Sequence, residues 1–460
     1  MTDVLKCISP IDGSVFATRS VLSMDEAQAA AARARAAQAA WAARPLAERI
    51  DLVMAGVAAV GAMNDEIVPE LAHMMGRPVR YGGEFRGFNE RASHMAAIAA
   101  EALAPIEVGE DATFKRYIKR IPQGVVFVVA PWNYPYMTAI NTVAPALIAG
   151  NTVVLKHATQ TLLVGERMAR AFHSAGIPAD VFQNVFLDHD TTSDLIASGA
   201  FNFVNFTGSV GGGRAMERAA AGTFTGVGTE LGGKDPGYVM EDADLDAAVD
   251  TLIDGAMFNS GQCCCGIERI YVHESLYDAF VEKAVDIVNG YKLGNPLDAE
   301  TSIGPMASTR FAAEVRAQIA EALADGAVAH IAPMAADDGA AYLTPQILTN
   351  VTHKMRVMRD ESFGPVVGIM KVSSDEEAIA LMNDSEFGLT ASLWTADLDR
   401  AQAVGDRVET GTVFLNRADY LDPGLCWTGC KNTGRGGGLS IIGFHNLTRP
   451  KSYHLKKVTK

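Results

Sequence analysis

Three adjacent cysteines, Cys263, Cys264 and Cys265, stand in the run FNSGQCCCG. Neighbouring cysteines rarely bridge to each other, because a disulfide needs Cβ atoms that face at a specific separation. Three consecutive side chains are also poorly placed to converge on one metal ion. We therefore expect at least one of them to be a nucleophilic thiol at a loop tip, with three small buried apolar side chains as the alternative.

Two further polar groups could assist such a thiol. Asn133 lies in APWNYP, where two prolines hold the loop, and its side-chain N–H could stabilise an oxyanion. Glu230 lies in TELGGKDP, where an apolar, glycine-flanked carboxylate could be a base with a raised pKa. The alternatives are a turn-forming Asn133 and a structural, salt-bridged Glu230.

A glycine-rich turn, FTGSVGGG at 206–213, leads from a predicted strand into a helix. Glycines let the backbone approach an anion, and a helix N-terminus favours negative charge. The spacing is not GxGxxG, so it does not predict an ordinary dinucleotide fingerprint. A tight turn chosen for packing explains this run equally well.

The bulk composition limits the function classes. The chain has 460 residues, a net charge of -15 and 48% hydrophobic residues, which suits large cores and argues against nucleic-acid binding. The uncharged stretch 125–155 is interrupted by prolines and asparagines, so we expect no membrane span. Six cysteines without paired spacing, ten histidines without a metal motif and no signal peptide predict a cytoplasmic protein with no metal site.

The residues that could do chemistry lie among alternating strands and helices. Ala-rich helical patterns occupy 25–43, 46–75 and 92–103. A first α/β series has strands at 125–129, 152–156, 181–186 and 203–209, with a helix at 162–174. A second series has helices at 242–258 and 373–383 and strands at 391–395 and 411–416. Segments 115–121 and 449–458 alternate as a pair of projecting strands. The fold class is α/β, with two doubly wound parallel-sheet domains and a small β arm.

The order of the motifs resembles the aldehyde dehydrogenase superfamily from about Ser9 to the C-terminus. The motifs on which the resemblance rests are GNTVVLKHA, APWNYP, FTGS, TELGGKDP, FNSGQCCCG, ESFGPVV and NDSEFGLTASLWT. The resemblance implies a Rossmann-like cofactor domain at 1–113 and 126–232, to which 424–445 returns, and a catalytic domain at 233–423. It implies bridging or oligomerisation strands at 114–125 and 446–460, and a homodimer or homotetramer.

The resemblance also implies the roles of the site residues. Gln262 points to Cys264 as the nucleophile, with Asn133 as the oxyanion-hole amide and Glu230 as the base that activates the thiol or a hydrolytic water. The implied reaction is oxidation of an aldehyde to the acid by NAD or NADP through a thiohemiacetal and a thioester. The implied cofactor-binding residues are Trp132, Lys156, Thr159, Gly208, Ser209, Leu231, Glu361 and Phe363. The implied substrate pocket is formed by Tyr134, Asn141, Phe258, Cys263, Cys265, Leu421 and Trp427.

Three departures from the family pattern affect these expectations. His157, Ala158 and Thr159 replace Pro-Ser-Glu, which removes the carboxylate that would repel a 2′-phosphate, so NADP becomes admissible and His157 or Lys156 could favour it. Gly436–Gly438 stands where relatives have Gly-Arg-Glu, which leaves Glu230 without that supporting carboxylate.

The third departure is Asn141, at an often aromatic position. With Asp419 expected at the pocket mouth, it suggests a polar aldehyde, such as an amino- or hydroxyaldehyde. Two alternatives remain: a CoA-acylating enzyme, which the presence of Glu230 disfavours, and a non-catalytic protein on the same scaffold.

Overall fold

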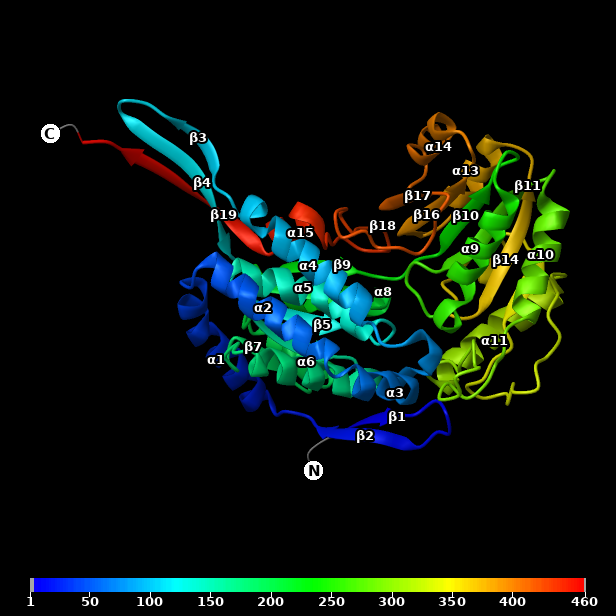
Figure 1. The fold of residues 1–460 in the computed structure, drawn as a ribbon, viewed down its shortest axis with the longest axis horizontal. Helices are drawn as coiled ribbons and strands as arrows, with labels where there is room; N and C mark the ends of the chain where they lie inside the picture. The colour runs from blue at the N-terminus through cyan, green and yellow to red at the C-terminus, as the bar shows by residue number, and fades with distance from the viewer. Residues whose placement is uncertain (1–3, 459–460) are drawn as a thin grey trace.

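The computed structural model describes residues 4–458 and contains two separate parallel sheets (Figure 1). The first has the strand order β7-β6-β5-β8-β9 and is parallel throughout. Its strands are β5 (Val125–Ala130), β6 (Thr152–His157), β7 (Phe182–Asn184), β8 (Phe203–Thr207) and β9 (Gly226–Glu230). The predicted α/β class with parallel sheets is confirmed.

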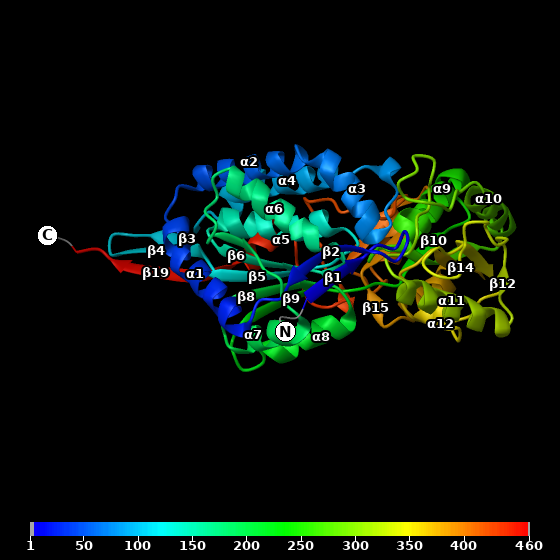
Figure 2. The same ribbon diagram turned by 90° about the horizontal axis from the view of Figure 1, so that it is seen from below.

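Helices cover both faces of the five-stranded sheet (Figure 2). One face carries α2 (Leu46–Gly61), α4 (Phe85–Ala102), α5 (Pro135–Ala149) and α6 (Leu162–Ser174). The other carries α1 (Met24–Ala42), α7 (His189–Ala197) and α8 (Val210–Ala220). Alternate residues of β5 point into the two cores, Val126 and Val128 to one and Val125 and Phe127 to the other. This alternation explains why the strand reads as a continuous apolar run.

The second sheet has seven strands in the order β12-β13-β14-β11-β10-β16-β17, parallel except for the edge pair β12 and β13. The strands are β10 (Asp235–Val239), β11 (Ile267–His273), β12 (Val328–Ala329), β13 (Gln346–Thr349), β14 (Val366–Val372), β16 (Thr390–Trp394) and β17 (Thr412–Leu415). Its helices are α9 (Leu245–Met257), α10 (Tyr277–Asn289), α11 (Thr309–Ala324), α12 (Arg356–Arg359), α13 (Asp375–Asn383) and α14 (Leu398–Gly405).

Several smaller elements differ from the sequence expectation. The projecting arm has three strands, because β3 (Ile106–Glu110) pairs with β4 (Phe114–Pro122), which pairs with β19 (Thr448–Lys456). The helix predicted over 46–75 is divided at Met63 into α2 and α3 (Asn64–Met75), and the helix predicted from 92 begins at Phe85. The hairpin of β1 (Val4–Ile8) and β2 (Val15–Ser20) and the pair β15 (Phe387–Gly388) and β18 (Cys430–Lys431) were not predicted.

The short helix α15 (Ser440–Asn446) packs against α4 and α5, so the C-terminal segment returns to the first sheet. The domain boundaries and the oligomer expected from the arm stay predictions. Between residues 4 and 458, no helix is both long and apolar enough to cross a membrane.

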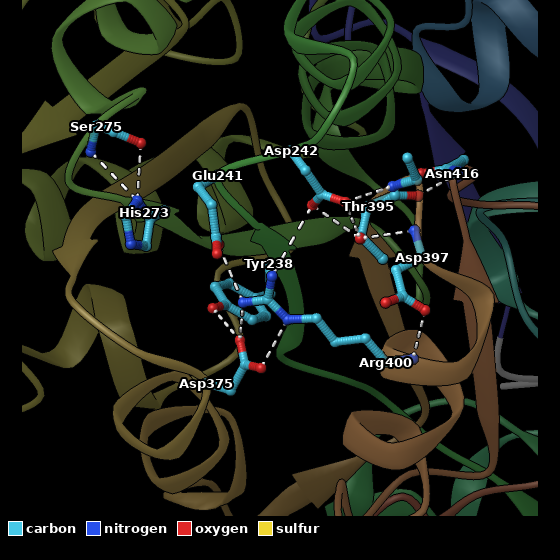
Figure 3. A network of polar contacts seen from close by, with 11 residues as sticks. Tyr238, Glu241, Asp242, His273, Ser275, Asp375, Thr395, Asp397, Arg400 and Asn416 are labelled. Atoms are coloured by element: carbon cyan, nitrogen blue, oxygen red, sulfur yellow. Dashed lines mark hydrogen bonds and ion pairs between the residues drawn. The ribbon is translucent and has the colours of Figure 1, made fainter.

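The carboxyl edge of the seven-stranded sheet is filled by a polar network centred on Arg400 (Figure 3). Its guanidinium pairs with Asp375 at 2.7 Å and with Glu241 at 3.0 Å. The Tyr238 hydroxyl donates to Asp375, and the Thr395 hydroxyl donates to Asp242. Ligands commonly bind at the carboxyl ends of parallel strands. Here paired side chains occupy that edge and tie α13 and α14 to the strands.

Candidate active site

The predicted site residues gather where the two sheets face each other. The carboxyl ends of β5, β6, β8 and β9 carry Asn133, Lys156, Gly208 and Glu230. The amino ends of β10, β11 and β14 follow the segments that carry Gly232, Cys264 and Phe363. The site is therefore built from the carboxyl edge of one sheet and the amino edge of the other.

Asn133 follows β5 and is 4% exposed. Its side-chain amide donates to the Gln262 carbonyl at 3.3 Å, which joins the first sheet to the cysteine loop. Its own carbonyl accepts from Arg77 at 2.7 Å and from the Asn259 amide at 3.3 Å. Arg77 is in turn paired with buried Glu84 at 2.6 Å. This network holds the amide in place, as an oxyanion donor requires.

The cysteine loop has a strained backbone. Asn259 and Ser260, in the turn Phe258–Gly261, have positive φ values of 55° and 57°. A Cβ on Gly261 would lie 2.3 Å from the Gly364 carbonyl, so only glycine fits there. The Gln262 side chain clamps the loop, since its amide donates to Asn259 and its oxygen accepts from the Ala307 N–H at 2.8 Å.

Within the triplet, Cys264 is half-buried, whereas Cys263 and Cys265 are buried. The neighbouring thiols lower the pKa of Cys264 to about 6, while the pKa of Cys263 is raised to about 12. The three sulfurs lie within 4.8 Å of one another, so our expectation that consecutive cysteines would diverge is wrong. A turn at Cys264–Cys265, closed by the bond from the Gly266 N–H to the Cys263 carbonyl at 3.2 Å, accounts for this convergence. Cys264 is thus the accessible and acidic thiol.

Asp419 is half-buried and lies beside the cysteines. Its carboxylate accepts from the Cys265 thiol at 2.9 Å and from the Cys263 thiol at 3.3 Å. It has a positive φ of 47° and sits in the loop after β17. These contacts occupy the two flanking thiols and leave Cys264 free of that carboxylate.

Glu230 is the last residue of β9 and is 8% exposed. Burial raises the pKa of its carboxyl to about 7, although the Thr207 hydroxyl bond and the Arg91 charge oppose that rise. Thr207 donates to its Oε2 at 3.4 Å. A Cβ on Gly438 would lie 2.8 Å from its Oε1, so the glycine in place of the family's glutamate leaves room for this carboxylate.

Close backbone approaches bring the separate motifs together. A Cβ on Gly233 would lie 2.5 Å from the Cys264 carbonyl, and one on Gly232 would lie 2.2 Å from the Glu361 carboxylate. The Gly233 N–H also donates to Glu361 at 3.0 Å. The segment after Glu230 therefore contacts both the cysteine loop and the segment before β14.

The residues predicted to bind the cofactor include a buried cation, a buried acid and a helix N-terminus. The Lys156 ammonium is 5% exposed, and burial lowers its pKa to about 8; no hydrogen bond or ion pair joins it to another residue of the described chain. Burial raises the pKa of Glu361 to about 8. Ser209 caps α8, and Gly211 has open space where a side chain would stand. A buried cation, a buried acid and an open helix N-terminus fit a dinucleotide.

The other predicted cofactor residues are placed as follows. Trp132 stacks on Phe311 at 5.2 Å and meets Phe363 edge-on at 5.4 Å. The Gly208 N–H donates to the Glu230 carbonyl at 3.1 Å, and Leu231 packs where a Cβ on Gly213 would stand. Thr159 lies half-buried in the turn after β6.

His157 does not match its suggested role. It is 4% exposed, and burial lowers its pKa to about 3, so it is neutral. Its Nδ1 lies 3.2 Å from the Thr161 hydroxyl. A neutral, enclosed imidazole supplies no positive charge to a 2′-phosphate.

The predicted substrate-pocket residues fall into two groups. Tyr134, Leu421 and Trp427 pack in the same core cluster as the three cysteines. Phe258 instead meets Tyr81 edge-on at 4.8 Å. Asn141 is 2% exposed, and its oxygen accepts from Arg91 at 3.4 Å.

Arg91, on α4, was not predicted from the sequence. It is 8% exposed and also donates to the Met137 carbonyl at 2.9 Å. Burial lowers its pKa, and its charge acts on Cys264 and Glu230. Among residues 4–458 no carboxylate lies within ion-pairing distance of Arg91, so its hydrogen-bond partners are neutral oxygens. Its place in an Ala-rich helix left no signal in the sequence.

A second unpredicted group is the buried pair of Lys234 and Glu268, joined at 2.6 Å. The Glu268 carboxylate also accepts from the backbone N–H groups of Ser362 and Phe363, both at 2.8 Å. The pair therefore positions the segment that carries Glu361 and Phe363. Lys234 in the GGKDP motif was the only signal that could have suggested it.

Comparison with known proteins agrees with this geometry. Residues 2–453 match the aldehyde dehydrogenase family. A succinate-semialdehyde dehydrogenase [NADP(+)] of Deinococcus radiodurans is 31% identical over 452 residues, covering 96% of this chain and 93% of the relative. A probable succinate-semialdehyde dehydrogenase [NADP(+)] of Synechocystis is 36% identical, covering 77% and 78%.

Among solved structures, succinate-semialdehyde dehydrogenase from Burkholderia pseudomallei superposes with a TM-score of 0.94 at 30% identity. The match covers 98% of this chain and 94% of that one. The chain belongs to the aldehyde dehydrogenase family and is an NAD(P)-dependent oxidoreductase of that family.

Proposed function

We propose that this enzyme oxidises an aldehyde to its carboxylic acid through a thioester on Cys264. The observation that carries the proposal is the meeting of three groups. An accessible thiol with a pKa of about 6, a buried amide at Asn133 and a carboxyl at Glu230 with a pKa of about 7 lie in one site. A free thiol, with a pKa of about 8.5, would be only a few per cent thiolate at pH 7. The thiols of Cys263 and Cys265 lower the pKa of Cys264, which increases its thiolate fraction at this pH.

The steps follow from the residues. The Cys264 thiolate adds to the aldehyde carbon, and the Asn133 amide and the Cys264 backbone N–H donate to the alkoxide. Glu361 and Phe363 would hold the nicotinamide, which would supply the hydride acceptor for the substrate carbon. Glu230 then takes a proton from water as the oxygen attacks the thioester. The C–S bond breaks, and the low pKa of Cys264 makes its thiolate a good leaving group.

We infer a preference for NADP. Thr159 stands at the position of the family's ribose-binding glutamate, so no carboxylate of that residue repels a 2′-phosphate. Lys156, with a pKa of about 8, is mostly cationic at neutral pH. The relatives from Deinococcus radiodurans and Synechocystis carry NADP(+) in their names.

We also infer an aldehyde that bears a carboxylate, such as succinate semialdehyde. The Arg91 guanidinium is a buried positive charge that donates to Asn141, acts on Cys264, and has no carboxylate within ion-pairing distance among residues 4–458. A buried cation without a carboxylate partner is costly, and a substrate carboxylate would satisfy it. The positive charge of Arg91 would repel the ammonium group of an aminoaldehyde. Of the polar aldehydes suggested by Asn141, aminoaldehydes are therefore disfavoured. The names of the relatives support this choice.

The test is to assay a panel of aldehydes with NAD and with NADP and to measure the formation of reduced cofactor by its absorbance. We expect succinate semialdehyde with NADP to give the highest kcat/KM, above butanal and 4-aminobutanal, with no dependence on CoA. Cys264→Ala should abolish turnover, whereas Cys426→Ala, a control thiol, should not. Formation of an acyl-CoA product would support the CoA-acylating alternative. An absence of reduced cofactor with every aldehyde would refute the proposed function.

A further inference from the structure

A small cavity of about 80 Å³ lies between α5, β8 and the glycine segment before α15. Its inner wall is formed by Asn141, Thr142 and Gly438, which are buried. Its rim includes Arg435 and Asn446, which are exposed. The cavity thus connects the interior of the site with the protein surface.

Two glycines that line this cavity also lie next to the Glu230 side chain. Gly436 and Gly438 line the cavity, and a Cβ on Gly438 would lie 2.8 Å from Glu230 Oε1. A Cβ on Gly436 would lie 3.2 Å from Glu230 Cγ. Because neither position carries a side chain, no side chain of Gly436 or Gly438 blocks the way from the carboxylate to the cavity.

The cavity also carries an unsatisfied donor. Asn141 is 2% exposed, and its Nδ2 is buried with no hydrogen-bond partner in the described chain, while its oxygen accepts from Arg91. An unpaired buried amide costs free energy unless water satisfies it. A water molecule needs about 10–15 Å³ of such volume, so the cavity has room for several. Thr142 and Asn205 provide further polar lining.

We propose that this cavity holds a chain of water molecules that carries the proton from Glu230 to solvent, with Asn141 as the residue that positions the innermost water. The proposal rests on the proposed function of Glu230 as the hydrolytic base. When water attacks the thioester, its oxygen bonds to the acyl carbon and one proton passes to Glu230. The C–S bond electrons stay on Cys264, and the acid leaves. Glu230 then gives its proton to the cavity water and is ready for the next cycle.

Asn205→Leu tests the proposal, because it keeps the side-chain size, removes a polar wall and leaves Glu230 untouched. Asn184→Leu is the matched control: Asn184 lies on β7 in the same sheet and also has an unpaired oxygen, but it does not line this cavity. The substrate is p-nitrophenyl acetate without cofactor. The nitrophenolate burst reports acylation of Cys264, and the later steady rate reports hydrolysis.

We expect Asn205→Leu to keep the burst but to slow hydrolysis about tenfold, within the range of general acid–base effects. Added 2,6-lutidine, a proton carrier whose hindered nitrogen is a poor nucleophile toward esters, should restore the rate after subtraction of the enzyme-free rate, which a merely structural defect would not allow. Thr142→Val should show the same pattern if Asn205→Leu folds poorly. Unchanged hydrolysis in a folded variant, or a loss that 2,6-lutidine does not relieve, would overturn the water chain. A missing burst in the unaltered enzyme would instead refute the proposed function.

Discussion

Replacing Arg91 by methionine tests the inferred substrate class most directly. Met keeps an apolar stem of similar length but removes the guanidinium, which is 8% exposed and bonded to Asn141 and Met137. A hydrogen bond to a charged group contributes about 1.5–3 kcal/mol. A loss of about 2 kcal/mol corresponds to a roughly 30-fold decrease, at 1.4 kcal/mol per factor of ten.

The expected result is therefore selective. kcat/KM for succinate semialdehyde should fall roughly 30-fold, whereas kcat/KM for butanal, which has no carboxylate, should change little. The same variant should raise the pKa of Glu230, because the Arg91 charge lowers it in the unaltered enzyme. In the pH profile of kcat, the pH below which the rate falls should then be higher for both aldehydes.

The assay is initial-rate kinetics with both aldehydes at several pH values, with Arg91→Lys as the control that keeps a positive charge. Arg91→Lys should retain part of the selectivity for the carboxylate. Equal losses of kcat/KM for the two aldehydes would show that Arg91 supports the site as a whole rather than the substrate carboxylate. No loss with either aldehyde would refute the carboxylate contact.

Three further predictions concern other parts of the site. The steady-state rate of thioester hydrolysis should rise with pH through about 7, where Glu230 loses its proton. The rate of the hydride-transfer burst, measured by stopped flow, should rise through about 6, where Cys264 loses its proton. If the two pH profiles coincide, the assignment of the two groups is contradicted. Thr159→Glu should lower the ratio of NADP to NAD efficiency about tenfold or more, since it restores a carboxylate against the 2′-phosphate; an unchanged ratio would count against our cofactor inference. Glu268→Gln leaves the Lys234 cation buried and unpaired, so the free energy of unfolding should fall by about 3–5 kcal/mol. Thermal unfolding measures this fall, and an unaltered melting temperature would contradict the importance of this pair.

Many of the helices and strands could be predicted from the pattern of apolar residues along short stretches of the sequence. The apolar runs at 125–129 and 152–156 correctly predicted the buried central strands β5 and β6, because such strands are covered on both faces. The helix over 46–75 was wrong in part: the chain turns between Gly61 and Asn64, but a single glycine inside a helical pattern is also tolerated in a continuous helix. The third strand of the arm was missed because β3 is short and mostly exposed, so it has no alternating apolar pattern.

Sequence alone determined the family and the choice of Cys264, since the order of the motifs and the Gln262 spacing are properties of the chain. Only the tertiary structure decided what surrounds that thiol. The Asn133–Gln262 bond spans 129 residues, and Gly233 and Glu361 meet across 128. Such contacts depend on how two sheets pack, which residue spacing does not encode. Arg91 without a carboxylate partner, Asp419 beside the cysteines and the cavity at Gly438 arise in the same way: each is a relation between distant segments.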